Sequence, residues 1–385
     1  MKRFIFLLIM ASIFACTSSN DEPGEMDDTG DDMGGGPVSG EGATEVNFSI
    51  AVLTENDSEE YMLYDINANG NIVATTNLNQ AFGFQGRPKY NVDNGYLMLF
   101  KDFNEAISWR RNLKTGLNQT FTNYFISPSN KTGIRNFGDS NYLITFFQDY
   151  KGNNGDKWFV RIYDITNGTS SEDVYFADGG PFNPYFSGTR FARDGKFFGL
   201  YRDVSDALTM KILDLNSPLT PTVLNVATKR HFTMVDDDIY LFGENEYQIF
   251  NCANGSISNS SQTPESIYSS FQIFESSLKG DQLTFPFTYG QPSQYVRGPA
   301  IYDLTEGVNI LFDLNEFDVA MEGSGQFIQT STTSINNQTE EVIVLGYNYQ
   351  NIALEFKHGI AFLNYNMEVI ATLEIPFEAV EIMIK

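Results

Sequence analysis

A short phrase that recurs along the chain constrains the fold more than any other feature of the sequence. In most copies, apolar residues lead to an Asp or Asn, which is followed by an apolar residue and a turn. The Asp or Asn of the seven copies stands at Asp65, Asn112, Asp164, Asp214, Asn251, Asp303 and Asn364. Successive copies are 47, 52, 50, 37, 52 and 61 residues apart. A repeat of about 50 residues is typical of four-stranded propeller blades, so the phrase predicts seven blades.

The sequence around each copy supplies the strands of such a blade. A strongly apolar segment precedes every copy, a more polar segment precedes that one in all copies but the first, and most copies are followed by a Gly-containing turn. No run has a convincing helical period. Residues 46–385 are therefore predicted to be all-β, a seven-bladed β-propeller of four-stranded antiparallel blades. The uneven intervals leave two alternatives open, namely two β-domains or a six-bladed ring with an irregular insertion.

The end of the chain suggests how the propeller closes. Residues 377–384 alternate in polarity and follow the last strand expected for the seventh blade. Because the first blade lacks an inner strand, we predict that this segment supplies it, which closes the ring and removes an open sheet edge. The repeated Asp or Asn suits the end of a third strand, since its side chain can accept hydrogen bonds from turn amides.

The beginning of the chain has the features of an export signal. Two basic residues precede an apolar run at 4–14, which is too short to span a bilayer but fits a secretory signal. The run ends in Ile13-Phe14-Ala15-Cys16, which resembles a bacterial lipobox, where the cysteine is acylated. We predict a lipoprotein signal peptide over residues 1–15 and lipidation of Cys16. The alternative is an ordinary signal peptide with a coincidental cysteine.

The following segment, residues 16–45, is rich in Asp, Glu and Gly and contains no Lys or Arg. It has too little apolar surface to fold, so we predict a disordered tether. Acidic residues directly behind a lipidated cysteine resemble the export signal of Bacteroidota-type surface lipoproteins. The resemblance implies a protein of the outer membrane that faces the cell exterior and is held by its lipid alone. A spacer without routing information is the alternative.

The charge of the chain excludes several classes of partner and site. With 24 Lys and Arg against 49 Asp and Glu, the formal charge is −25, which argues against nucleic acid as a partner. Two His and two Cys exclude a three-histidine metal site and Cys-rich zinc sites. Cys252, the thiol that remains after acylation, is interpreted as an inert core residue.

The sequence predicts no cofactor. It contains none of the common phosphate, dinucleotide, zinc-protease or serine-hydrolase motifs. Asp149, Asn153 and Asp156 surround two glycines and could hold Ca²⁺ through oxygen atoms. A solvated loop is the favoured interpretation of this segment.

The candidate binding site lies on one face of the predicted propeller. Loops from second to third strands and loops between blades share that face, and here they are long and aromatic. Aligned blades place three bases at one inner-strand position, and acids, among them Glu55, recur where second strands end. The alternative is that these bases pair with nearby carboxylates and the aromatic rings pack under their loops. The candidate ligand-binding residues are Lys89, Arg135, Arg190, Arg230, Asp102, Asp149, Asp203, Trp158, Tyr185, Tyr289 and Tyr347.

A lipid-anchored, acidic propeller on a tether resembles the Bacteroidota surface lipoproteins that serve TonB-dependent uptake, some of which capture ferric siderophores. The resemblance implies a non-enzymatic protein that binds a small molecule, siderophore or glycan and passes it to an outer-membrane transporter. Two alternatives stay open. The chain could be a polysaccharide lyase or hydrolase that uses rim acids and bases, or an adhesion or scaffold protein whose loop face binds another protein.

Overall fold

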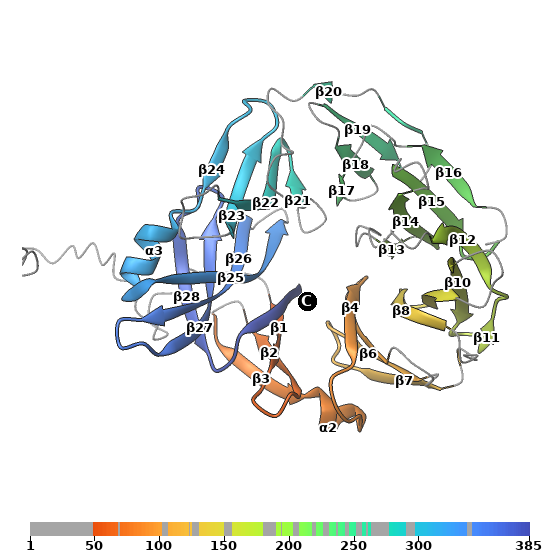
Figure 1. Cartoon of the computed structure of the whole chain (residues 1–385), viewed down its shortest axis with the longest axis horizontal. Coiled ribbons are helices and arrows are strands. Elements are labelled where there is room, and N and C mark those ends of the chain that lie inside the picture. Colours follow the sequence, from red (N-terminus) through yellow and green to blue (C-terminus); the bar gives the residue numbers. More distant parts are fainter. Residues whose placement is uncertain are drawn as a thin grey trace, which may run out of the picture. The chain divides into compact units, whose positions relative to one another are not determined.

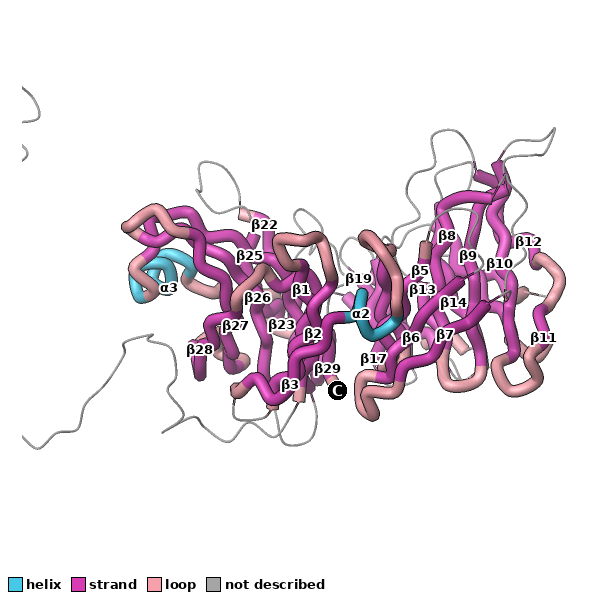
Figure 2. The backbone as a smooth tube through the Cα atoms, turned by 90° about the horizontal axis from the view of Figure 1, so that it is seen from below, coloured by secondary structure: helices cyan, strands magenta, loops and turns pink. Residues whose placement is uncertain are grey.

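Strands make up most of the residues that the computed structural model describes, and the helices among them are short, as Figure 2 shows. All described residues belong to one unit of the chain, residues 35–385; the other unit, residues 1–34, lies outside the described part. Within that part, no helix is long and apolar enough to cross a membrane. The described residues are 49–67, 70–101, 107–122, 124, 131–149, 156–179, 190–193, 195–202, 208–217, 221–225, 231–235, 238–242, 246–251, 256–258, 261–262, 277–289, 297–336 and 341–385.

The described strands form seven antiparallel sheets, numbered here by their order along the chain. The first contains β29 (Ala379–Ile384), β1 (Ile50–Glu55), β2 (Tyr61–Ile66) and β3 (Ile72–Asn77). The second contains β4 (Lys89–Asp93), β5 (Tyr96–Phe100), β6 (Ile107–Asn112) and β7 (Asn118–Thr122). The third contains β8 (Lys131–Gly138), β9 (Tyr142–Asp149), β10 (Asp156–Asp164), β11 (Thr169–Ser170) and β12 (Val174–Gly179).

The remaining four sheets have four strands each. The fourth contains β13 (Arg190–Arg193), β14 (Lys196–Arg202), β15 (Leu208–Asp214) and β16 (Thr222–Asn225). The fifth contains β17 (His231–Val235), β18 (Asp238–Phe242), β19 (Glu246–Asn251) and β20 (Ser261–Gln262). The sixth contains β21 (Ser277–Lys279), β22 (Gln282–Thr288), β23 (Arg297–Asp303) and β24 (Asn309–Leu311). The seventh contains β25 (Gly323–Asn336), β26 (Glu341–Asn351), β27 (Phe356–Asn364) and β28 (Val369–Ile375). The all-β, antiparallel part of the fold prediction is confirmed.

The recurring Asp or Asn ends the third strand of its sheet in six of the seven sheets, and in the first sheet it stands one residue before the end. Among the described residues, five of these side chains accept hydrogen bonds from amides of the following turn, as the sequence predicted. Asp303, for example, accepts from the amides of Thr305 and Glu306 at 2.9 and 2.8 Å. The other four are Asn112, Asp164, Asp214 and Asn364.

The second strand of each sheet has a mostly apolar sequence because both of its faces are covered. In β1, Ile50 and Val52 belong to a hydrophobic cluster shared with the seventh sheet, whereas Ala51 and Leu53 belong to one shared with the second sheet. Alternate residues of a strand point to opposite faces, so a strand between two clusters reads as a continuous apolar run. Clusters of the same kind join every consecutive pair of described sheets.

The predicted pairing of the C-terminal strand with the first sheet is confirmed. β29 pairs antiparallel with β1, with Ile50 opposite Ile384 and Val52 opposite Ile382. Figure 1 shows the C-terminus beside β1, at the edge that faces away from β2. The last side chain adds an ion pair, since Lys385 Nζ lies 2.8 Å from Asp65 Oδ1.

The two described helices were not expected from the sequence. α2 (Leu78–Phe82) begins after Asn77, whose side chain accepts from the amide of Gln80, and it ends at Gly83 with φ of 72°. α3 (Leu314–Ala320) begins after Asp313, which caps two amides. Both are too short for a helical period to show in the sequence.

Candidate functional site

Lys89 and Arg135 occupy equivalent positions in their sheets. Lys89 pairs with Phe100, which in turn stands opposite Ser108, four residues before the repeated Asn112. Arg135 pairs with Phe146, which stands opposite Val160, four residues before the repeated Asp164. Both basic side chains are half-buried. This part of the predicted alignment is confirmed.

Arg190 is one residue out of step with the other two. It pairs with Gly199, and Gly199 lies opposite Lys211, which stands three residues before Asp214 instead of four. The prediction that the three bases share one position is therefore wrong for Arg190. An alignment on the apolar second strands cannot detect a shift of one residue in the inner strand.

The described aromatic candidates serve packing. Tyr289 donates from its hydroxyl to the carbonyl of Phe312 at 3.1 Å. Trp158 stacks on Phe146 with ring centroids 4.8 Å apart. Tyr347 is 1% exposed and lies 5.2 Å from the ring of Phe317, and burial raises its pKa.

Two of these placements correct the prediction. Trp158 lies in β10 and Tyr347 in β26, not in loops, because both strands extend beyond the apolar segments read from the sequence. We do not retain Tyr347 as a ligand-binding residue, since the core covers it. Asp149 ends β9 and stands opposite Lys131 and Lys157 in the strand register. The candidates Cys16, Asp102, Tyr185, Asp203 and Arg230 lie outside the described residues, as do Cys252 and Asn153.

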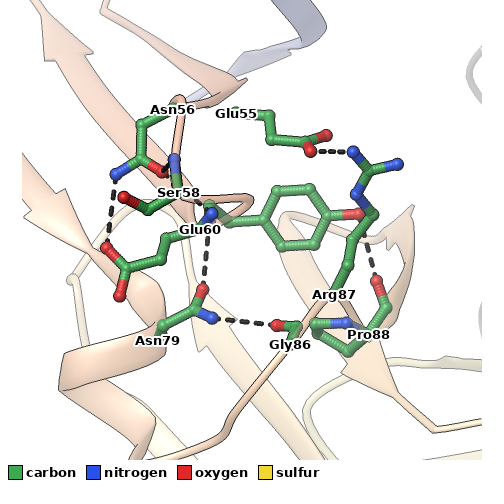
Figure 3. A network of polar contacts seen from close by, with 9 residues as sticks. Glu55, Asn56, Ser58, Glu60, Asn79, Gly86, Arg87 and Pro88 are labelled. Carbon is green, nitrogen blue, oxygen red and sulfur yellow. Dashed lines mark hydrogen bonds and ion pairs between the residues drawn. The ribbon is translucent and has the colours of Figure 1, made fainter.

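A polar network lies where the β1–β2 turn meets the chain that leads into β4 (Figure 3). Glu55 forms an ion pair with Arg87. Asn79 accepts from the amide of Tyr61 at 3.0 Å and donates to the carbonyl of Gly86 at 2.9 Å. The acid predicted at the end of β1 thus pairs with a nearby base, which agrees with the structural interpretation of the rim charges.

A different group of polar side chains lies where the seventh sheet meets β29. Asn348 is 8% exposed and stands opposite His358 in the β26–β27 register, so both side chains lie on the same face. The Asn348 amide donates to Glu378 Oε2 at 3.2 Å. A Cβ on Gly346 would come within 2.8 Å of Thr330 Oγ1 and 2.9 Å of Ala379 Cβ, so this glycine lets β25 and β29 approach. We call Thr330, Asn348, His358 and Glu378 the polar cluster.

Three atoms of the polar cluster are buried with no hydrogen-bond partner within the described part of the chain. They are Asn348 Oδ1, His358 Nδ1 and Thr330 Oγ1. Buried polar groups are normally paired, and each one left unpaired costs about 1–3 kcal/mol. The three atoms therefore have unused hydrogen-bonding capacity at one place in the fold. Among the described residues there is no group of three or more His, Cys, Asp or Glu side chains that could hold a metal ion.

The sequence reasoning did not find the polar cluster. One signal was present, because Asn348 is the single polar side chain within the apolar run 342–349. The other members come from strands distant in sequence, and they meet through the pairing of β25, β26 and β29. Phe356 stands two residues before His358 on β27 and is 61% exposed, so it adds an aromatic ring to the same face.

No protein-family model and no curated protein matches the chain. Solved structures do resemble it. A mutant of Synechocystis ACO has a TM-score of 0.50 at 7% identity, with 91% of this chain and 94% of that chain covered. Another mutant of the same apocarotenoid oxygenase gives 0.49 at 7% identity over the same shares. Dihydro-heme d1 dehydrogenase NirN gives 0.46 at 10% identity, covering 90% of this chain and 76% of that one. At such identities the likeness concerns the fold alone.

Proposed function

We propose that this chain is a non-enzymatic binding protein that holds a small hydroxyl-rich ligand, such as a glycan, at the polar cluster. The observation that carries the proposal is the set of three buried, unpaired atoms on Thr330, Asn348 and His358. A hydroxyl group both donates and accepts, so it can satisfy an amide oxygen, an imidazole nitrogen or another hydroxyl. The exposed ring of Phe356 on the same face provides apolar contact, and ligand sites commonly combine the two.

We further propose that the seven sheets are the blades of a closed propeller. Each consecutive pair of described sheets shares a hydrophobic cluster, and Ile50, Val344 and Ile382 belong to a cluster common to the first and seventh sheets. β29 completes the first sheet. The likeness to the ACO structure, a seven-bladed propeller, supports the same arrangement. In such a ring the β26–β27 hairpin and the β28–β29 connection share the face where the sequence predicts a ligand.

The proposed address of the protein rests on its N-terminal sequence. Acylation at Cys16 and a tether over residues 16–45 would hold the binding unit at the outer membrane, where it could pass its ligand to a transporter. If this is right, Cys16→Ser moves the protein from the membrane fraction to the soluble fraction. Membrane association that survives the substitution would contradict the anchor.

The ligand proposal is tested by thermal unfolding in the presence of a panel of neutral oligosaccharides. A ligand that binds the native state raises the melting temperature, by an amount that grows with its concentration. We expect at least one oligosaccharide to do so, and we expect His358→Ala and Asn348→Ser to abolish the shift.

The matched control is Asn136→Ser, which changes a fully buried asparagine of β8 outside the polar cluster. It is expected to lower the melting temperature of the free protein and to keep the ligand shift. A panel without any shift, or a shift that persists in both cluster variants, would refute the proposed site.

A further inference from the structure

The hairpin that joins β26 to β27 exposes three large apolar side chains within five residues. Ile352, Leu354 and Phe356 are 72%, 69% and 61% exposed. Val319, near the end of α3, is 76% exposed. Two backbone hydrogen bonds connect it to Ile352 of the hairpin through Glu322. The amide of Ile352 donates to the carbonyl of Glu322 at 3.1 Å, and the amide of Glu322 donates to the carbonyl of Val319 at 3.0 Å. We call these four apolar side chains the apolar tip.

Leu354 adopts a backbone conformation that leucine disfavours. Its φ is 64°, in the left-handed region. Met367 has the same conformation, with φ of 66°, in the turn between β27 and β28, but its side chain is only 6% exposed and packs in the core. The Leu354 side chain, by contrast, is mostly exposed to solvent. Folding therefore does not account for a leucine at this position.

The charge around the apolar tip is acidic. Glu316, Glu322, Glu355 and Glu374 are exposed. One base lies among them, since Lys357 Nζ is 3.9 Å from Glu355 Oε2 and 3.7 Å from Glu374 Oε1. Soluble monomers rarely expose contiguous apolar patches with polar borders unless the patch binds something. Here an apolar centre has a negatively charged border.

We propose that the apolar tip docks into a partner protein whose surface presents an apolar groove bordered by Lys and Arg. Such a border complements the four glutamates and favours both encounter and orientation. An anionic membrane would be repelled by the same glutamates and by the formal charge of −25. A symmetric contact with a second copy of this chain would bring the acidic borders together. The basic partner is thus the occupant that the charges favour.

The test uses two synthetic amphipathic helical peptides with the same leucine face, one with lysine and one with glutamate on the polar face. Binding to the full chain is measured by fluorescence anisotropy. We expect the lysine peptide to bind, with a Kd that increases as the NaCl concentration rises from about 50 to about 500 mM. We expect no binding of the glutamate peptide.

A triple variant, Ile352→Ser with Leu354→Gly and Phe356→Thr, separates the apolar tip from the rest of the acidic surface. We expect its Kd for the lysine peptide to be at least about tenfold higher than that of the wild type. The matched control is Val73→Ser with Val223→Ser and Val308→Ser. It removes three apolar side chains that are 61%, 53% and 51% exposed elsewhere, and it should leave the Kd unchanged.

Leu354→Gly alone should raise the melting temperature, because glycine adopts a positive φ without strain. Weaker binding in this variant therefore cannot result from unfolding. Equal Kd values for the wild type and the triple variant would overturn the proposal. So would an apolar-tip-dependent dimer in sedimentation velocity, or apolar-tip-dependent binding to phosphatidylcholine vesicles in place of the peptide.

Discussion

At the scale of single residues, Asp93 is a buried acidic residue whose carboxyl group forms hydrogen bonds to two other sheets. It ends β4, is 7% exposed, and its Oδ2 accepts from the amides of Gly138 and Ala192, each at 3.0 Å. These amides belong to the third and fourth sheets, so one carboxyl group links three sheets. The side-chain amide of the neighbouring Asn94 donates to the carbonyl of Gly138 at 3.1 Å and to the carbonyl of Ala192. Burial raises the pKa of Asp93 to about 8, although the two backbone hydrogen bonds act in the opposite direction.

This raised pKa predicts how stability depends on pH. Native Asp93 keeps its proton until about pH 8, whereas an unfolded aspartate loses it near about pH 4. Between these values the native state binds more protons than the unfolded state, so the free energy of unfolding from this group falls as pH rises. Asp93→Asn keeps the acceptor oxygen and cannot ionise. We expect its melting temperature relative to the wild type to increase steadily from about pH 5 to about pH 8.

The control for this prediction is Asp93→Ala. It leaves the amides of Gly138 and Ala192 without their acceptor and, relative to Asp93→Asn, should cost about 1–3 kcal/mol for each amide at every pH. If the wild type and Asp93→Asn give parallel curves of melting temperature against pH, Asp93 does not titrate in this window.

At the scale of elements, one five-residue turn with Asn first and Glu last occurs three times in the described part of the chain. In residues 56–60, the Asn56 side chain accepts from the amide of Glu60 at 2.9 Å and donates to its carboxylate at 3.2 Å. Residues 351–355 and 364–368 repeat both contacts. The fourth residue of each turn has a positive φ, and it is Glu59, Leu354 or Met367 in place of the glycine that this conformation favours.

Glu59 is suited to testing the free-energy cost of a positive φ at a non-glycine residue. Its φ is 59°, and its side chain is exposed, so a substitution removes no core packing. A non-glycine residue in this region costs about 1–2 kcal/mol, partly offset by the greater freedom of glycine in the unfolded chain. We therefore expect Glu59→Gly to stabilise the fold by about 0.5–1 kcal/mol, seen as a higher urea midpoint at unchanged slope. Asp57→Gly in the same turn gains no such relief and should destabilise slightly. Equal midpoints for the two variants would argue against strain at Glu59.

The elements themselves were largely predictable, because strands that are buried on both faces read as apolar runs and each repeat ends in an Asp or Asn. β5, for example, spans residues 96–100, which form the strongly apolar segment before the second copy of the repeated phrase. α2 was not predicted because five residues cannot show a helical period. Arg190 was misaligned because the register of its inner strand is offset by one residue from the registers of Lys89 and Arg135. The polar cluster could not be read because Thr330, Asn348 and Glu378 meet only through strand pairing and a register shift between Gln329 and Ser331.

At the scale of the whole unit, the order of the sheets follows the chain except at one place. The chain begins the first sheet at β1 and returns to it with β29, after the other six sheets. Ala379, Ile382 and Met383 of β29 are at most 3% exposed, and the strand contributes to two hydrophobic clusters. The last seven residues therefore connect the two ends of the described fold through both backbone pairing and apolar packing.

Deleting residues 379–385 tests how far the fold depends on this connection. The deletion leaves the edge of β1 unpaired and exposes the apolar surface that β29 covered, so a lower melting temperature or association of the protein is expected. Sedimentation velocity and thermal unfolding distinguish the two effects. Lys385→Ala is the control: it keeps the strand and removes only the ion pair with Asp65, which is worth about 0–1 kcal/mol for partly exposed charges. A deleted chain that stays monomeric and melts at the wild-type temperature would show that β29 does not hold the two ends together.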